Sequence, residues 1–194
     1  MRKIAFFDVD GTLTSEIDGS IPASAVNAIR AARANGNLMF INTGRCFHNL
    51  EERFQSIGFD GFVCGCGTDI YCDTRQLMHV TQSHETTMQL LKKAKEVDMD
   101  IVFESCDSTI FDISRPIHDP DALKLQEENL EKGFEEFDPW TKPNFCCDKF
   151  VTWIRNEAQL NEFRKVSDQF FECIDRGGLF REFVPLGYSK ATGL

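Results

Sequence analysis

The first 64 residues alternate between short apolar runs and helical segments, and this alternation restricts the fold more than any other feature. Apolar, β-prone residues fill 4–9, 38–42 and 60–64. Between them, 22–36 and 47–57 have the pattern of helices that stop at a glycine. Strands that alternate with helices predict a parallel sheet with right-handed crossovers, and therefore an α/β fold. The continuous run 4–9 is typical of a strand covered on both faces.

The middle of the chain has a different pattern of expected helices and strands. Two short segments, 69–72 and 77–80, predict a hairpin, and 133–148 has the pattern of a loop. Beyond the hairpin, helices and strands no longer alternate regularly, which predicts an α+β block. Its expected helices are 85–97, 119–132 and 157–168, and its expected strands are 101–104, 109–113, 149–154, 170–174 and 179–184.

Composition and charge restrict the possible partners and the compartment. The formal net charge of −10 makes nucleic acid or an anionic membrane an unexpected partner. No run of about 18 apolar residues occurs, so no membrane span is expected. The N-terminus leads directly into a strand without the apolar region and cleavage site of a signal peptide, which favours a cytoplasmic location. Nothing in the sequence indicates an oligomeric state.

The eight cysteines and four histidines do not have the spacing of a disulfide scaffold or a zinc site. The closest cysteine pairs are Cys64 with Cys66 and Cys146 with Cys147, and neither is a C-x-x-C pair. The histidines are too scattered to indicate a metal site. We therefore expect reduced and mostly buried thiols.

Acidic and hydroxyl side chains follow two strands of the predicted sheet. Asp8 and Asp10 end the first apolar run, and Thr43 follows the second. Ligands of open α/β sheets bind beyond the carboxyl ends of the strands, so these side chains are expected at a site. Mg²⁺ is a natural partner for such carboxylates. Without Thr43 and Lys190, the pair Asp8 and Asp10 would be better explained as a turn or as the metal site of a glycosyltransferase.

Three motifs in order resemble one enzyme family. The segment 8–13, DVDGTL, resembles the first motif of the haloacid dehalogenase-like phosphatase superfamily. The segment 42–45, NTGR, resembles the second motif as written in the Cof-type branch, and Ser189-Lys190 resembles the third. The resemblance implies a Rossmann-like parallel-sheet core formed by 1–81 and 185–194. The block 82–184 is similar to the α+β cap domain inserted in that branch.

The resemblance also implies a reaction and its catalytic residues. Asp8 would be the nucleophile that forms an aspartyl-phosphate, and Asp10 would be the general acid and then the general base. Thr43 would hydrogen-bond a phosphoryl oxygen, and Lys190 would neutralise charge on Asp8 and the phosphoryl group. Mg²⁺ would be held by Asp8 and the main-chain carbonyl of Asp10.

The same resemblance implies where the substrate binds. The substrate would be a small phosphorylated metabolite, with the predicted binding residues Gly44, Arg45, Cys66 and Gly67. The Cof-type branch commonly has Asn-Gly after the third strand, where this chain has Cys66-Gly67.

One motif of the family is absent from these 194 residues. The fourth motif, a G-D-x-x-N-D-like loop that supplies further carboxylates for Mg²⁺, does not occur after Lys190. We therefore expect a truncated chain whose core is incomplete at its C-terminal side and whose first strand lies at a sheet edge. Two hypotheses follow: a Mg²⁺-dependent phosphatase, or a non-catalytic phosphate-binding or interaction remnant.

Overall fold

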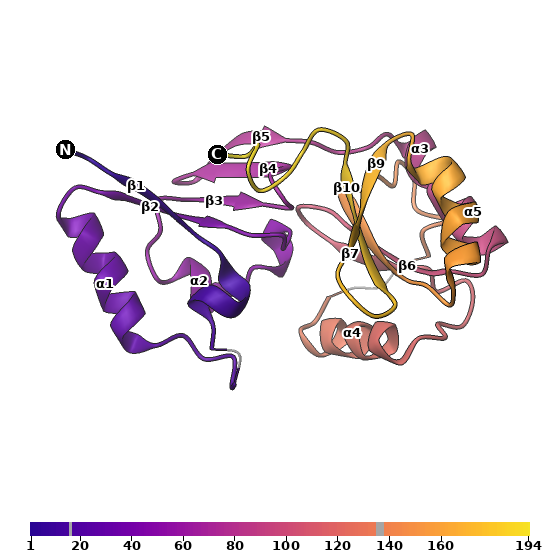
Figure 1. The fold of residues 1–194 in the computed structure, drawn as a ribbon, viewed down its shortest axis with the longest axis horizontal. Helices are drawn as coiled ribbons and strands as arrows, with labels where there is room; N and C mark the ends of the chain where they lie inside the picture. The colour runs from indigo at the N-terminus through magenta and orange to yellow at the C-terminus, as the bar shows by residue number, and fades with distance from the viewer. Residues whose placement is uncertain (16, 135–137) are drawn as a thin grey trace. The chain divides into compact units, whose positions relative to one another are not determined.

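The computed structural model describes residues 1–15, 17–134 and 138–194. The chain divides into two compact units (Figure 1). Unit 1 comprises Met1–Val80 and Gly187–Leu194, and unit 2 comprises Thr81–Leu186.

Unit 1 is built on a five-stranded sheet with the order β1-β2-β3-β4-β5. The first three strands are parallel neighbours, and β3, β4 and β5 pair in antiparallel fashion. The prediction of an α/β fold with a parallel sheet in the first 64 residues is therefore confirmed. The strands are β1 (Ile4–Phe7), β2 (Leu38–Asn42), β3 (Gly61–Cys64), β4 (Asp69–Cys72) and β5 (Arg75–His79).

Helix α1 (Ala23–Ala34) covers part of this sheet, as the alanine-rich segment 22–36 predicts. Ile29 is buried in the same core cluster as Met39 and Ile41 of β2. Pro22 stands immediately before the helix, where its fixed φ angle suits a helix start. Burial of this apolar stripe, more than helix propensity alone, stabilises a helix of this length.

The single helix predicted for 47–57 is wrong. The structure has a short 3₁₀ turn, η2 (Phe47–Asn49), and a one-turn helix, α2 (Glu52–Gln55). Leu50 and Glu51 interrupt the helical backbone with ψ angles of 100° and 147°. This interruption accompanies the contacts that the Glu51 carboxylate makes with Arg45 and Arg53, at 3.2 and 2.6 Å.

The first strand is shorter and more exposed than the sequence predicts. It ends at Phe7, and Val9–Leu13 form a tight π-type turn, η1. Strand β1 lies at the edge of the sheet, and Ile4 and Phe6 are 57% and 38% exposed. The expectation that this run is covered on both faces is therefore wrong, whereas its expected edge position is confirmed.

Unit 2 is built on an antiparallel five-stranded sheet with the order β7-β6-β8-β10-β9. Three helices accompany it: α3 (His84–Glu96), α4 (Pro120–Glu131) and α5 (Glu157–Ser167). All predicted helices and strands of this block are present with shifted ends. The strands are β6 (Asp100–Glu104), β7 (Thr109–Phe111), β8 (Lys149–Trp153), β9 (Phe171–Asp175) and β10 (Phe180–Pro185).

The sheet of unit 2 has a different cluster on each face. Phe150 of β8 packs with Leu90 of α3 and Phe163 of α5. The next residue, Val151, points to the opposite face and shares a cluster with Ala122 of α4. The helices therefore cover both faces of the sheet.

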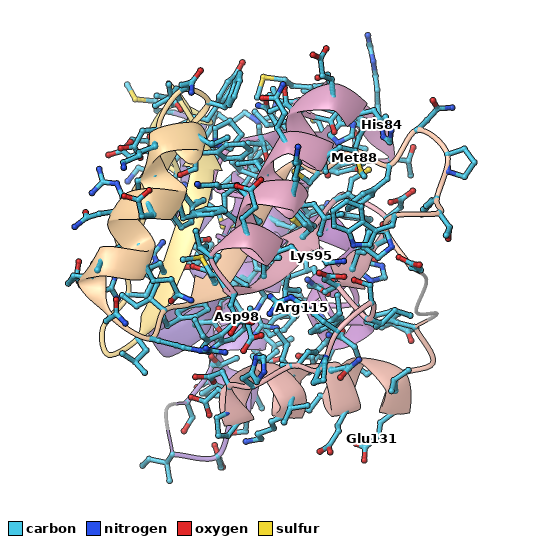
Figure 2. The ribbon with its side chains drawn as sticks, turned by 90° about the vertical axis from the view of Figure 1, so that its right-hand side faces the viewer. His84, Met88, Lys95, Asp98, Arg115 and Glu131 are labelled. Atoms are coloured by element: carbon cyan, nitrogen blue, oxygen red, sulfur yellow. The ribbon has the colours of Figure 1, made fainter. Side chains whose placement is uncertain are left out.

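Buried charges in unit 2 are paired. The Lys149 ammonium lies 2.5 Å from Glu182 and 2.9 Å from Glu104. Arg115 pairs with Asp98 at 2.9 Å, and Figure 2 shows these two residues near the Lys95 end of α3. Pairing of this kind is what makes burial of charged side chains tolerable.

The stretch predicted as a loop, 133–148, contains no helix or strand in its described parts, 133–134 and 138–148. Residues 135–137 of that prediction lie outside the described residues. Among the helices of the described chain, none is long and apolar enough to cross a membrane.

Candidate active site

The first predicted site residue, Asp8, directly follows strand β1. Its carboxylate accepts a 2.8 Å hydrogen bond from the Val9 amide and thereby caps the η1 turn. The turn requires Gly11, whose φ angle of +70° is one that glycine adopts without strain. The sequence D-x-D-G thus folds into a turn that presents Asp8 at the carboxyl end of the strand, with its side chain 41% exposed.

Lys190 lies beside Asp8 within unit 1. Its Nζ atom is 2.7 Å from Oδ1 of Asp8. The Lys190 carbonyl accepts a 3.0 Å hydrogen bond from Nδ2 of Asn42, at the end of β2. Ser189 and Thr192 fix the surrounding turn, because the amide of each donates to the hydroxyl of the other, at 2.8 and 3.2 Å. The first and third motifs therefore meet at one site.

Gly67 lies directly under the turn that carries Lys190. A Cβ atom added to Gly67 would lie only 2.3 Å from the Ser189 carbonyl oxygen, and one added to Gly193 would lie 2.9 Å from the Gly67 Cα. The backbone of Gly67 also has a φ angle of +89°. The close approach of these two backbone segments therefore requires glycine at both positions.

Asp10 is held by Arg45 rather than by Lys190. Atoms Nη2 and Nε of Arg45 donate to the two carboxylate oxygens of Asp10 at 2.7 and 3.2 Å. Atom Nη1 of the same guanidinium donates to Glu51 at 3.2 Å. This two-point geometry orients the Asp10 carboxylate, whose side chain is 61% exposed.

The same contacts shift two pKa values. Partial burial lowers the pKa of Arg45, but the hydrogen bonds and charges of Asp10 and Glu51 outweigh burial and raise it overall. Burial raises the pKa of Glu51, but Arg53 and Arg45 outweigh burial and lower it overall. Arg45 and Glu51 are therefore both charged at neutral pH.

Thr43 is fully buried at the end of β2 and organises its neighbours. Its hydroxyl accepts a 3.2 Å hydrogen bond from the Arg45 amide, and its carbonyl accepts one of 3.1 Å from the Cys66 amide. The Gly65 amide donates to the Arg45 carbonyl at 2.8 Å. The second motif, which includes Gly44, is thus joined to the loop that contains Cys66 and Gly67.

The thiols around this loop are poorly suited to nucleophilic chemistry. Cys66 is buried, and burial raises the pKa of the Cys64 thiol far above its ordinary value. All eight cysteines are free, but only four of them are buried and the other four are half-buried, so the prediction of mostly buried thiols holds for half of them.

Three contributing residues were not among the predicted site residues. Asn42 holds the main chain of Lys190, Glu51 holds Arg45, and Gly193 packs on Gly67. Asn42 gave a signal, because a polar residue that ends an apolar strand often serves a site. Glu51 and Gly193 gave none, since a side-chain ion pair and a backbone crossing leave no recognisable sequence pattern.

The donors around Asp8 are compatible with a hard cation. Oδ1 of Asp8 accepts both hydrogen bonds described above, and within the described residues no donor reaches Oδ2. An open carboxylate oxygen suits Mg²⁺, which is commonly held by one or two carboxylates together with water and substrate phosphate. Asp8 and Asp10 belong to no cluster of three or more potential His, Cys, Asp or Glu ligands in the described chain.

Comparison with solved structures shows the same architecture in longer chains. A hypothetical protein from Geobacillus kaustophilus aligns with a TM-score of 0.81 at 25% identity, over 100% of this chain and 73% of that one. A phosphatase of the haloalkanoate (HAD) enzyme superfamily from Bacteroides thetaiotaomicron gives 0.77 at 20% identity, over 100% and 70%. A HAD subclass IIB sugar phosphatase gives 0.76 at 20% identity, over 100% and 73%.

Sequence comparison gives the family. A search of curated proteins finds no match. The model of the haloacid dehalogenase-like hydrolase family, in contrast, matches residues 5–194, nearly the whole chain. This match includes the three motifs, two of which the structure joins through Asp8 and Lys190. The chain therefore belongs to the family of haloacid dehalogenase-like hydrolases.

Proposed function

We propose that this protein is a Mg²⁺-dependent phosphatase that hydrolyses a small phosphorylated metabolite through an aspartyl-phosphate. The 2.7 Å contact between Lys190 and Asp8 carries the proposal. It places a cation beside a partly exposed carboxylate at the end of a parallel strand, where α/β folds bind ligands. Phosphoryl transfer needs chiefly positioning and charge stabilisation, which these two residues can supply.

In the first step, an Asp8 carboxylate oxygen attacks phosphorus and the bond from phosphorus to the ester oxygen breaks. Asp10 gives a proton to the departing oxygen. In the second step, Asp10 takes a proton from water, which attacks phosphorus and regenerates the Asp8 carboxylate. Lys190 neutralises negative charge near Asp8 during both steps. Thr43 donates its hydroxyl hydrogen to a phosphoryl oxygen, which requires that the site open around its buried side chain.

The ion pair between Arg45 and Asp10 adds one requirement to this scheme. A carboxylate held at both oxygens by a guanidinium is a poor proton donor. Acid catalysis by Asp10 therefore requires that the pair open. A phosphoryl group is a competing partner for Arg45, so substrate binding would release Asp10. Because of this exchange, we include Arg45 in the proposed substrate-binding residues, together with Gly44, Cys66 and Gly67.

Mg²⁺ belongs to the proposal as the resident cofactor. Asp8 and the main-chain carbonyl of Asp10 would hold it, and it would supply further neutralisation of phosphoryl charge. The open Oδ2 atom of Asp8 supports this assignment.

The substrate class and the division of labour are also proposed. One fold neighbour is a sugar phosphatase, which supports a small phosphorylated metabolite as substrate. We assign catalysis to a core of residues 1–81 and 185–194 and substrate selection to a cap of residues 82–184. A cytoplasmic setting is consistent with the eight free thiols, since reducing compartments keep cysteines free.

The test is phosphate release from an aryl phosphate by wild-type protein and by Asp8→Asn, with Mg²⁺ and with EDTA. We expect Asp8→Asn to lower kcat by roughly 10³-fold or more, as loss of a nucleophile does in other covalent mechanisms. Asp73→Asn is the matched control, because Asp73 is an exposed turn residue of unit 1 whose φ angle of +50° suits asparagine.

Near wild-type turnover by Asp8→Asn would contradict the proposal. The alternative, a non-catalytic phosphate-binding protein, would be supported if the wild-type protein binds phosphate but releases none from the ester. Its binding would then weaken in Lys190→Met.

A further inference from the structure

A polar pocket lies in unit 1, at the ends of the strands where the chain enters the sheet. Its volume is about 400 Å³, within the range of small-molecule sites. The side chains that matter for its chemistry are Arg2, Arg30, Arg33, Asn37, Leu38 and Asp60.

This pocket is separate from the candidate active site. Arg2, Asn37 and Asp60 precede strands β1, β2 and β3, whereas Asp8 follows β1. Figure 1 shows β1 running from the N-terminal end of the chain to the η1 turn. At about 3.3 Å per residue, the strand separates Arg2 from Asp8 by roughly 20 Å.

Two of the three arginines are fixed in place. Arg33 donates to Asp60 at 2.8 Å, and a Cβ atom added to Gly58 would lie 3.1 Å from its guanidinium. Arg30 donates to the carbonyl oxygens of Ile57 and Ser56 at 3.1 and 3.2 Å. Carbonyl oxygens orient the Arg30 guanidinium without cancelling its full positive charge.

The third arginine, Arg2, is exposed and makes no hydrogen bond or ion pair with any residue that the structure describes. It acts on Asp60 through its charge alone. Burial raises the pKa of Asp60, but the hydrogen bonds from Arg33 and the Met39 amide, with the charges of Arg33 and Arg2, lower it overall. Asp60 is therefore ionised, and it neutralises only one of the three guanidinium groups.

The remaining positive charge stands out in a chain whose formal net charge is −10. The C-terminal end of α1 adds a partial negative charge nearby, because Ala34 lines the same pocket. This contribution equals about half a unit charge, so an excess of positive charge remains. Guanidinium groups have the planar geometry that matches phosphoryl oxygens.

We propose that this pocket binds a small metabolite with two or more phosphoryl groups, at a site distinct from the active site. Arg2 and Arg30 supply the uncompensated charge, and Arg33 is held in place by Asp60. The inference does not depend on the proposed phosphatase activity.

The experiment is a titration of the ¹⁵N-labelled full chain with inorganic pyrophosphate in EDTA, followed by NMR. We expect saturable shifts of the backbone amides of Gly36, Asn37 and Leu38, which line the pocket, with a Kd of about 1 mM or tighter at low salt. Arg2→Gln should weaken this binding roughly fivefold or more, because it removes a charge-assisted contact. Arg30→Gln should weaken it as well, in protein whose NMR spectrum shows an intact fold.

Arg75→Gln is the control, since it removes an exposed arginine from the same unit, on β5. Binding should be unchanged in this variant. Three results would overturn the proposal: no saturable shift at the three amides, shifts that persist unchanged in Arg2→Gln, or shifts confined to Asp8, Thr43 and Lys190. Citrate binding as tightly as pyrophosphate would overturn the assignment to a phosphoryl ligand.

Discussion

The ammonium group of Lys190 lies 2.7 Å from the carboxylate of Asp8, although 182 positions separate the two residues in the chain. The contact is anchored at both ends. The Val9 amide orients Asp8, and Asn42 together with the Ser189–Thr192 turn fixes the main chain of Lys190. A lysine that merely lay on the surface would not need this support.

The first prediction concerns Lys190. Lys190→Met should lower kcat/KM for an aryl phosphate by roughly 10²-fold or more, because it removes a preorganised charge from the site where negative charge develops. Lys190→Arg should recover part of the activity. Lys3→Met is the control, since Lys3 is an exposed lysine of the same unit. Equal activity of Lys190→Met and Lys3→Met would rule out a catalytic role for Lys190.

The second prediction separates binding from chemistry at Arg45. Arg45→Gln should raise KM about tenfold and change kcat less, because a phosphoryl contact is lost while Asp10 is already released. Arg53→Gln is the matched control, because Arg53 shares Glu51 but does not contact Asp10 in the structure. Steady-state kinetics of both variants measure kcat and KM separately and so test this prediction. A lower kcat with unchanged KM would show instead that Arg45 only positions Asp10.

The third prediction concerns Gly67. Gly67→Ala combines an unfavourable φ angle of +89° with a Cβ atom 2.3 Å from the Ser189 carbonyl oxygen. Gly36→Ala is the control for backbone strain alone, because Gly36 has a φ angle of +83° and open space around its Cβ position. Urea unfolding should show that Gly67→Ala costs about 1–3 kcal/mol more than Gly36→Ala. Equal costs would mean that the Ser189 turn moves away without penalty.

The fourth prediction is a pH dependence of stability in unit 2. Burial raises the pKa of Glu182, but Lys149 and Arg176 outweigh burial and lower it below its ordinary value of 4.5. A depressed folded-state pKa adds stability above the unfolded-state pKa, and this contribution is lost as pH falls through the folded-state value. Glu182→Gln should therefore lower the free energy of unfolding at pH 7 by about 1–3 kcal/mol.

The difference between Glu182→Gln and wild type should shrink as the pH falls below 4.5 and through the lowered folded-state pKa of Glu182, because the wild-type glutamate becomes protonated there. Urea unfolding of both proteins at pH 7 and at acidic pH measures this difference in the free energy of unfolding. The control is Glu131→Gln, since Glu131 is exposed at the end of α4, as Figure 2 shows. A difference that stays constant with pH would mean that packing, and not charge, accounts for the effect.

The sequence predicted local structure well where the pattern itself determines it. The alternation in the first 64 residues predicted the parallel strands, and the helix expected over 119–132 is present as α4. It failed in one segment where side-chain ion pairs accompany a break in the helical backbone. The segment 47–57 has a helical pattern, but Glu51 pairs with Arg45 and Arg53 and the helix is interrupted there.

The candidate site shows the same limit. Asp8, Asp10, Thr43 and Lys190 could be named from their motifs. The resemblance to the family also implied that Lys190 lies close enough to Asp8 to neutralise its charge. The pairing of Asp10 with Arg45 could not, because it depends on side-chain directions at two strand ends. The support of Lys190 by Gly67 and Gly193 depends on a backbone crossing that leaves no local pattern.

The separation of Asp8 from Lys190 has a consequence for the protein during its synthesis. Chains grow at about 5–20 residues per second, so Lys190 is made roughly 10–40 s after Asp8. All of unit 2 is synthesised within that interval, because it occupies Thr81–Leu186. The first strands of unit 1 can thus leave the ribosome with Asp8 in place while its ammonium partner does not yet exist. The order of the motifs along the gene therefore delays the pairing: Asp8, the proposed nucleophile, lacks its cationic partner until unit 2 has been translated.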